Sequence, residues 1–161
     1  MALIVLEGCD GTGKTTLAKS LAKIMDAKVI HCTAETPNNF DFFYQIIDMA
    51  NDRNIIADRW CYGQFVYQTE EERNLKGWLD QSELHDLELE MLRNNVKVVH
   101  VIAPPPEVEE RLALRNEKTA MPVQEIMDLF SYHLNKSIVP VIEWDTGESQ
   151  WFSGFKRKGD L

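Results

Sequence analysis

Apolar residues along the chain occur in two alternating patterns, as short continuous runs and as longer segments with helical spacing. The continuous runs predict buried strands, and the spaced segments predict amphipathic helices. The predicted strands cover residues 2–6, 27–32, 54–58, 96–103 and 140–144. The predicted helices cover residues 15–25, 40–51, 60–72, 80–94, 104–116 and 122–138. Since strands alternate with helices, we expect an α/β fold built on a parallel sheet.

Composition narrows the possible partners of this fold. The 161 residues suit one domain, 1–161, and the net charge is −9. A strongly acidic chain argues against nucleic acid or an anionic membrane surface as partner, because both reward clustered Lys and Arg. No apolar stretch approaches the roughly 18 residues that a membrane span requires. We therefore expect small-molecule partners, no nucleic acid and no membrane.

Cysteine usage bears on the compartment. Cys9, Cys32 and Cys61 form neither a CxxC pair nor a metal-binding spacing. An odd number of cysteines without framework spacing indicates free thiols in a reducing environment. The N-terminus also lacks the features of a signal peptide, so we expect a cytoplasmic protein.

The most specific motif is GCDGTGKT, residues 8–15, which matches the P-loop pattern GxxxxGK[ST]. It directly follows a predicted strand and directly opens a predicted helix. Its glycines allow backbone N–H groups to turn inward around an anion, and the helix N-terminus adds further donors. Lys14, expected as a solvent-facing charge, would neutralise the β- and γ-phosphates, and the Thr15 hydroxyl would ligate Mg²⁺. A glycine-rich turn that merely caps a helix is the alternative.

A second motif lies at the end of the strand at 54–58, where Asp58 ends the strand and Arg59 directly follows it. Open α/β sheets bind ligands at the carboxyl ends of their strands. Asp58 could hold Mg²⁺ through water there, and Arg59 could clamp a second phosphate with two hydrogen bonds. The alternative is a salt bridge at the end of a strand.

Four stretches together resemble thymidylate kinase and related deoxynucleoside monophosphate kinases: LEGCDGTGKTT, IIADRWCYGQFVYQ, PPPEVEERLALR and WDTGES. The resemblance implies a P-loop NTPase fold, a three-layer α/β/α sandwich with a five-stranded parallel sheet in the order 2-3-1-4-5. It also implies Mg²⁺-dependent transfer of the γ-phosphoryl group of ATP to a deoxynucleoside monophosphate, such as dTMP or a related deoxypyrimidine monophosphate. Similar kinases are often homodimers, so helix 80–94 either forms such an interface or packs on the sheet.

The resemblance assigns roles on the donor side. The implied ATP-binding residues are Gly8, Asp10, Gly11, Thr12, Gly13, Lys14, Thr15, Thr16, Arg111 and Arg115. Lys14, Arg59 and Arg115 would act on the transferring phosphoryl group, with Arg115 at the mouth of a short lid over 115–122. Thr15 and Asp58 would serve Mg²⁺. For Arg111, an ion pair with Glu107 is an equally good interpretation.

On the acceptor side, the resemblance implies that Asp10 accepts a hydrogen bond from the sugar 3′-OH and that Arg59 binds the acceptor phosphate. Gln64 would read the base edge, and Tyr67 would crowd the 2′ position. Much of the family's base-binding segment is missing here, and Gly63 replaces its usual serine. Phe43, with Phe40 and Phe42, could supply a stacking ring, or all three could be core residues.

Two other functions fit the same motifs. A deoxynucleoside kinase would phosphorylate a sugar hydroxyl and would need a carboxylate base, for which Glu35 is the candidate. A regulatory P-loop module would bind one nucleotide and no second substrate. Asp10 favours the monophosphate kinase over the deoxynucleoside kinase. Arg59, Gln64 and Tyr67, which follow the third strand, favour it over the regulatory module. A phosphate acceptor needs no general base, so we expect the four histidines to be core or surface residues.

Overall fold

A computed structural model describes residues 1–147 together with the backbone of residues 156–157. Its parallel strands are β1 (Leu3–Glu7), β2 (Lys28–His31), β3 (Ile55–Asp58), β4 (Lys97–Ile102) and β5 (Val141–Asp145). Its helices are α1 (Lys14–Met25), α2 (Phe40–Met49), α3 (Tyr62–Tyr67), α4 (Glu70–Leu75), α5 (Gln81–Arg93), α6 (Pro105–Leu114) and α7 (Val123–Lys136). The last two residues of the WDTGES stretch, Glu148 and Ser149, lie outside the described residues.

The sheet confirms the predicted topology. Its order is β2-β3-β1-β4-β5-β6, so the five parallel strands follow the order 2-3-1-4-5. The sixth strand, β6 (Lys156–Arg157), was not predicted. It pairs with β5 in antiparallel fashion, with Ile142 opposite Arg157. Two residues carry too little periodicity to be recognised as a strand before their partner is known.

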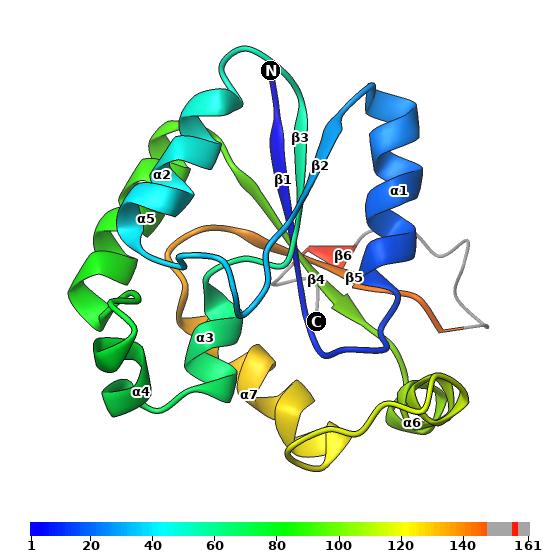
Figure 1. The fold of residues 1–161 in the computed structure, drawn as a ribbon. Helices are drawn as coiled ribbons and strands as arrows, with labels where there is room; N and C mark the ends of the chain where they lie inside the picture. Colours follow the sequence, from blue (N-terminus) through cyan, green and yellow to red (C-terminus); the bar gives the residue numbers. More distant parts are fainter. Residues whose placement is uncertain (148–155, 158–161) are drawn as a thin grey trace.

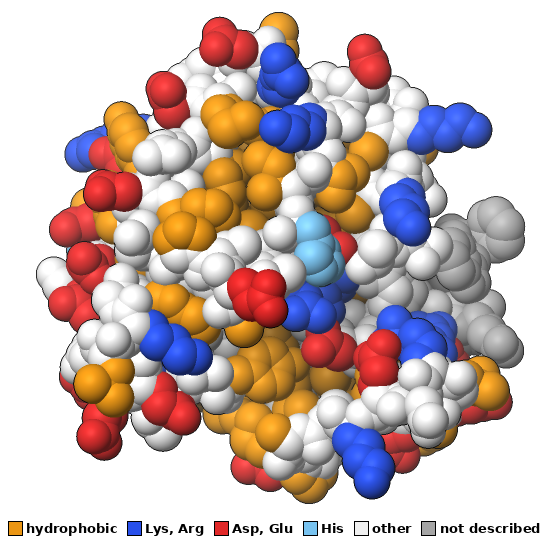
Figure 2. All heavy atoms as spheres, viewed as in Figure 1, with side chains coloured by type: hydrophobic (Ala, Val, Ile, Leu, Met, Phe, Trp, Pro, Cys, Tyr) orange, Lys and Arg blue, Asp and Glu red, His pale blue; other side chains and the backbone are white. Residues whose placement is uncertain are grey.

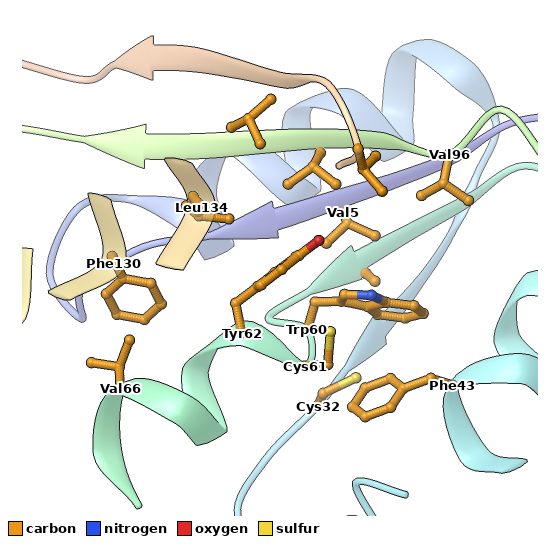
Figure 3. Packing of buried hydrophobic residues seen from close by; sticks show 14 of the residues in the cluster. Val5, Cys32, Phe43, Trp60, Cys61, Tyr62, Val66, Val96, Phe130 and Leu134 are labelled. Atoms are coloured by element: carbon orange, nitrogen blue, oxygen red, sulfur yellow. The ribbon is translucent and has the colours of Figure 1, made fainter. Parts of the chain in front are cut away.

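Helices cover both faces of the sheet (Figure 1), which completes the three layers. α1 covers one face, where its apolar side packs on Leu6, Ile56 and Val99. The other face carries the larger core beneath α2, α3, α5 and α7. Figure 3 shows Tyr62, Trp60 and Phe43 within that larger core. Within the described residues no helix is long and apolar enough to cross a membrane.

The prediction of one helix over residues 60–72 is wrong, because the structure has two short helices there. Gln68 adopts an extended conformation and ends α3. Thr69 then caps α4: its hydroxyl accepts from the Glu72 N–H at 3.3 Å, and Glu72 accepts from the Thr69 N–H at 2.7 Å. This capping box satisfies donors that a continuous helix would bond internally, so it fixes a new helix start.

The strand order decides what lies at the carboxyl edge of the sheet. β1 lies between β3 and β4, and Leu6 lies opposite Asp58 in the register. The loop after β1 and the Asp58-Arg59 pair after β3 are therefore neighbours. Residues far apart in the sequence thus meet at one site, as the sequence predicts for an open α/β sheet.

Candidate functional site

The loop between β1 and α1 needs glycine for two separate reasons. Gly8 has φ 144°, and a Cβ there would lie 2.3 Å from the carbonyl oxygen of Val101 in the adjacent strand β4. Gly13 has φ 93° and directly precedes the first residue of α1. These conformations exclude ordinary side chains and bend the loop around the N-terminus of α1. The residues predicted to bind phosphate therefore have the strand–loop–helix setting that a phosphate-binding loop requires.

The Lys14 side chain is buried, contrary to the prediction that it faces solvent. It is 5% exposed. Its ammonium donates to the carbonyl oxygens of Gly8 and Cys9, both at 2.7 Å, and lies 3.7 Å from Asp10. Burial lowers the pKa of Lys14, and the nearby Asp10 carboxylate acts in the opposite direction. The prediction of exposure failed because the curled loop offers backbone acceptors within reach of the side chain, and sequence spacing does not reveal these.

Thr146 and Arg111 support the loop through hydrogen bonds to its carbonyl groups. The Thr146 hydroxyl donates to the carbonyl of Thr12. Arg111 donates to the carbonyl of Gly11 at 3.2 Å and to the carbonyl of Thr146 at 3.2 Å. It also pairs with Glu107 at 3.2 Å, as the alternative interpretation held. Arg111 thus braces the loop rather than lining the cavity above it, and a direct contact with ATP remains only a prediction.

The cavity above the loop holds most of the predicted donor-side residues. Its walls are Asp10, Gly11, Gly13, Lys14, Thr15, Thr16, His31, Arg59, Arg115 and Glu117. Arg115 caps the C-terminus of α6 and pairs with Glu117 at 3.2 Å. The segment 115–122 lies between α6 and α7 without helix or strand, which suits the predicted lid.

Asp58 and Thr15 meet beside this cavity. The Thr15 hydroxyl donates to Asp58 Oδ2 at 2.8 Å, and His31 Nδ1 lies 2.9 Å from the same oxygen. The other oxygen, Oδ1, is buried and has no hydrogen-bond partner among the residues described. A carboxylate and a hydroxyl are oxygen ligands of the kind that Mg²⁺ prefers, and Mg²⁺ usually keeps several waters. The unpaired oxygen fits a hydrated cation, although the described part of the chain holds no cluster of three His, Cys, Asp or Glu that could bind a metal alone.

Asp10 and Arg59 form an ion pair that joins the two predicted halves of the site. Arg59 Nη2 donates to Asp10 Oδ1 at 2.8 Å, and the two side chains are 41% and 38% exposed. Arg59 has φ 74°, a left-handed conformation that is costly for a residue with a side chain. Asp10 and Arg59 both line the cavity above the loop and also a second cavity next to it. The ion pair is thus a shared wall between two adjoining spaces.

This second cavity lies against α3 and α7. Its walls include Glu7, Asn38, Trp60, Gln64, Tyr67, Trp78 and Phe130. The Tyr67 ring meets Phe130 edge to face with centroids 5.9 Å apart, and Tyr67 is 38% exposed. Figure 2 shows charged side chains gathered around a hollow that contains hydrophobic side chains, on this side of the molecule. An apolar interior with a few charged groups at its mouth suits a nucleotide base and its phosphate.

Two predicted acceptor residues have contacts that change their interpretation. Phe43 is completely buried, and its ring centroid lies 4.7 Å from that of Trp60. Figure 3 shows the two side chains next to each other in the core. Phe43 is therefore a core residue, and the prediction that it stacks on a base is wrong. Gln64 lines the cavity, but its oxygen accepts from the Leu79 N–H at 3.1 Å and its nitrogen donates to the carbonyl of Asn38 at 3.4 Å. Both ends of this amide thus hold the wall of the cavity.

Sequence reasoning missed Glu7, which ends β1. Its side chain is 1% exposed, yet it lines the second cavity. One oxygen, Oε1, accepts from the N–H groups of Trp60, Tyr62 and Gly63 at 2.9, 3.1 and 3.3 Å. Burial raises the pKa of Glu7 to about 7, against the opposing effect of Lys14. The available clue was an acidic residue at the end of an otherwise apolar strand.

Comparison with solved structures supports this assignment of the fold. The YorR protein from Bacillus subtilis, in complex with phosphorylated GDP, matches with a TM-score of 0.75 and 25% identity, over 94% of this chain and 89% of that chain. Deoxyadenosine kinase from M. mycoides with bound dATP matches with a TM-score of 0.56 and 14% identity, over 89% and 90% of the two chains. Thymidylate kinase from Candida albicans matches with a TM-score of 0.56 and 16% identity, over 91% and 84%. At these identities the two kinases show the fold alone.

Sequence comparison gives the family. No curated protein matches the chain at a significant level. A protein-family model described as an AAA domain matches residues 4–128, which include the phosphate-binding loop, the Asp58-Arg59 pair and α6. The chain therefore belongs to this AAA-domain family of P-loop proteins, which bind nucleotides.

Proposed function

We propose that this protein transfers the γ-phosphoryl group of ATP to a deoxynucleoside monophosphate, with dTMP or a related deoxypyrimidine monophosphate as acceptor. One observation carries the proposal. Two cavities, one over the phosphate-binding loop and one against α3, share Asp10 and Arg59 as a common wall. A protein that binds one nucleotide has no need of a second cavity that meets the first at an arginine. A phosphotransferase needs this arrangement, because donor and acceptor phosphates must approach each other.

On the donor side, the phosphates of ATP would lie on the loop N–H groups and the N-terminus of α1, with Lys14 turning from the carbonyls of Gly8 and Cys9 toward the β- and γ-phosphates. Thr15 and Asp58 would hold Mg²⁺ in this site. The ion supplies neutralisation of negative charge on the phosphates. Arg115, at the cavity wall, would approach the γ-phosphate as the 115–122 segment closes, and closure would exclude water that competes as acceptor.

On the acceptor side, Arg59 would bind the phosphate and Asp10 would accept from the sugar 3′-OH. Tyr67 would pack against C2′ and leave no room for a 2′-hydroxyl, and Gln64 would lie beside the base. An oxygen of the acceptor phosphate would attack the γ-phosphorus while the bond from that phosphorus to the β-phosphate oxygen breaks, releasing ADP. The attacking oxygen is already ionised at neutral pH, so positioning and charge stabilisation account for the catalysis.

A deoxynucleoside kinase stays as a second candidate because of Glu7. The carboxylate expected to act as base, Glu35, is exposed and does not line the acceptor cavity. Glu7 does line that cavity, and burial raises its pKa to about 7, a value suited to a general base. A kinase acting on a 5′-hydroxyl would use that carboxylate to remove the proton.

Release of ADP with different acceptors tests both candidates. The acceptors are dTMP, dUMP, dCMP, thymidine and no acceptor, with UMP, GMP and dGMP added because the YorR structure holds a guanine nucleotide. Turnover with a deoxypyrimidine monophosphate and none with thymidine is the expected result. Turnover with thymidine alone would establish the nucleoside kinase. ADP release that no acceptor stimulates would remove both candidates and leave a nucleotide-binding module.

A further inference from the structure

Glu7 lies where the loop after β3 turns into α3. A single carboxylate oxygen accepts three backbone N–H groups there, from Trp60, Tyr62 and Gly63. All three belong to a five-residue stretch that begins with Arg59. Above about pH 7, where Glu7 is ionised, these hydrogen bonds are roughly twice as strong as bonds to a neutral acceptor. Three donors on one oxygen define the path of the chain closely.

That stretch needs support, because Arg59 is in the left-handed region with φ 74°. This conformation costs on the order of 1–2 kcal/mol for a residue with a Cβ. The Arg59 N–H donates to the carbonyl of Leu6 at 3.0 Å, so the strand β1 holds the stretch through its backbone as well as through Glu7. Without such contacts the residue would relax toward negative φ and swing its guanidinium away from Asp10.

The same contacts orient the acceptor cavity. α3 starts at Tyr62 and carries both Gln64 and Tyr67, which line that cavity. A helix of six residues has little stability of its own, so its position depends on the contacts at its ends. Glu7 thus supports Arg59, and through α3 also Gln64 and Tyr67. These are the residues to which the proposed function gives an acceptor role, apart from Asp10.

We propose that Glu7 is a positioning residue for the acceptor site. It holds Arg59 and α3 in place by accepting hydrogen bonds from the backbone N–H groups of Trp60, Tyr62 and Gly63. The inference rests on the proposed function for its kinetic consequence, but its structural part stands alone. This positioning role is distinct from that of a general base. Oε1 is fully used by three donors, and a base would have to act through Oε2.

Replacement of Glu7 tests the proposal, with acceptor and ATP affinities measured separately by calorimetry and kcat measured by ADP release. At about pH 8, above the Glu7 pKa of about 7, Glu7→Gln keeps an oxygen that can accept the three N–H groups but loses the charge, so the dTMP Kd is expected to rise about 3- to 10-fold. Glu7→Ala loses the acceptor entirely, and the dTMP Kd is expected to rise about 10- to 100-fold. The ATP Kd should change less than about 3-fold in both, a split that general loss of structure would not produce.

Glu88→Gln is the matched control. Glu88 is also buried, accepts from the Tyr62 hydroxyl at 3.0 Å and lines neither nucleotide cavity. It should leave the dTMP Kd unchanged even if its melting temperature falls. Unchanged dTMP affinity in Glu7→Ala, or equal weakening of ATP and dTMP, would overturn the proposal. A loss of kcat in Glu7→Gln above about 1000-fold with unchanged acceptor affinity would overturn it in favour of the general base.

Amide hydrogen exchange keeps this test independent of the reaction. Exchange at Trp60, Tyr62 and Gly63 should accelerate at least about 10-fold in Glu7→Ala relative to the amides of β4, because these donors lose their acceptor. This result is expected even if the wild-type protein phosphorylates none of the acceptors. Such a lack of phosphorylation would refute the proposed function but not the positioning role of Glu7. Unchanged exchange at the three amides would refute the positioning role alone.

Discussion

Glu7 and His100 lie opposite each other in the register of the neighbouring strands β1 and β4, and burial shifts their pKa values in opposite directions. It raises the pKa of Glu7 from 4.5 to about 7 and lowers the pKa of His100 from 6.5 to about 4. Between pH 4.5 and 6.5 the unfolded chain therefore carries both charges, whereas the folded protein carries neither.

The two residues consequently have opposite effects on stability as pH changes. Folded Glu7 holds a proton that unfolded Glu7 has lost, so its contribution to the free energy of unfolding falls as pH rises from 4.5 to about 7. Folded His100 lacks a proton that the unfolded residue holds, so its contribution rises with pH between about 4 and 6.5. Each slope is about 1.4 kcal/mol per pH unit, and they offset each other.

Single replacements should expose these slopes. Relative to wild type, Glu7→Gln is expected to gain stability as pH rises from 4.5 to 6.5, and His100→Gln is expected to lose it, each by about 2 kcal/mol across the window. Urea unfolding of the three proteins at several pH values measures this. Differences that stay constant across the window would show that the two groups titrate normally in the folded protein.

Lys14→Met is expected to reduce phosphoryl transfer by at least about 100-fold. Its melting temperature should move only slightly, because the lost hydrogen bonds to Gly8 and Cys9 are offset by removal of a buried charge. ADP release and thermal unfolding measure the two effects. Lys19→Met, an exposed lysine of the same helix, is the control and should keep full activity. Activity in Lys14→Met near that of the control would show that the loop does not bind the reacting phosphates.

Arg59 allows a comparison of two replacements. Arg59→Ala and Arg59→Gly are both expected to weaken acceptor binding by about 30- to 1000-fold while ATP binding changes little, because both remove the guanidinium. They should differ in stability, since only glycine adopts φ 74° freely, and Arg59→Gly should be more stable by about 1 kcal/mol. Calorimetry and urea unfolding separate these effects. Equal weakening of ATP and acceptor would assign Arg59 to the donor side instead.

Tyr67→Ala is expected to raise the use of UMP relative to dUMP by about 10-fold or more, because removal of the ring opens space at the 2′ position. Tyr67→Phe keeps the ring and its edge-to-face contact with Phe130, so it should discriminate as the wild type does. The ratio of kcat/KM values for the two substrates is the measurement. If UMP or dGMP proved the best wild-type acceptor, both the sugar gate and the pyrimidine preference would be lost.

Local patterns predicted most of the fold because each strand and long helix has its own periodicity. The exceptions depend on contacts between distant residues. β6 exists only through its pairing with β5, and the break between α3 and α4 depends on the cap at Thr69. The capping box T-E-E-E was nonetheless visible in the sequence, and it could have placed that break.

For the candidate site too, the residues with a local motif were predicted, and those that depend on contacts between distant segments were not. The sequence motifs identified the loop, Asp58 and Arg59, because the chemistry of phosphate binding requires particular residue types at fixed spacing. They did not reveal that Lys14 is buried or that Glu7 binds the backbone of residues 60–63, since both depend on how separate segments meet. Phe43 was ambiguous because an aromatic residue on an apolar helix face suits a core as well as a ligand.

The wall that the two cavities share has a consequence for how the ligands bind. If ATP and acceptor bind as proposed, a phosphate in either cavity would alter the ion pair between Asp10 and Arg59, and therefore the field that the other phosphate meets. Thermodynamic linkage then requires ATP and acceptor to change each other's affinity by the same factor. Cooperativity between the two ligands, of whichever sign, would then depend on this one ion pair, and in Asp10→Asn or Arg59→Gly that reciprocal factor should move toward one.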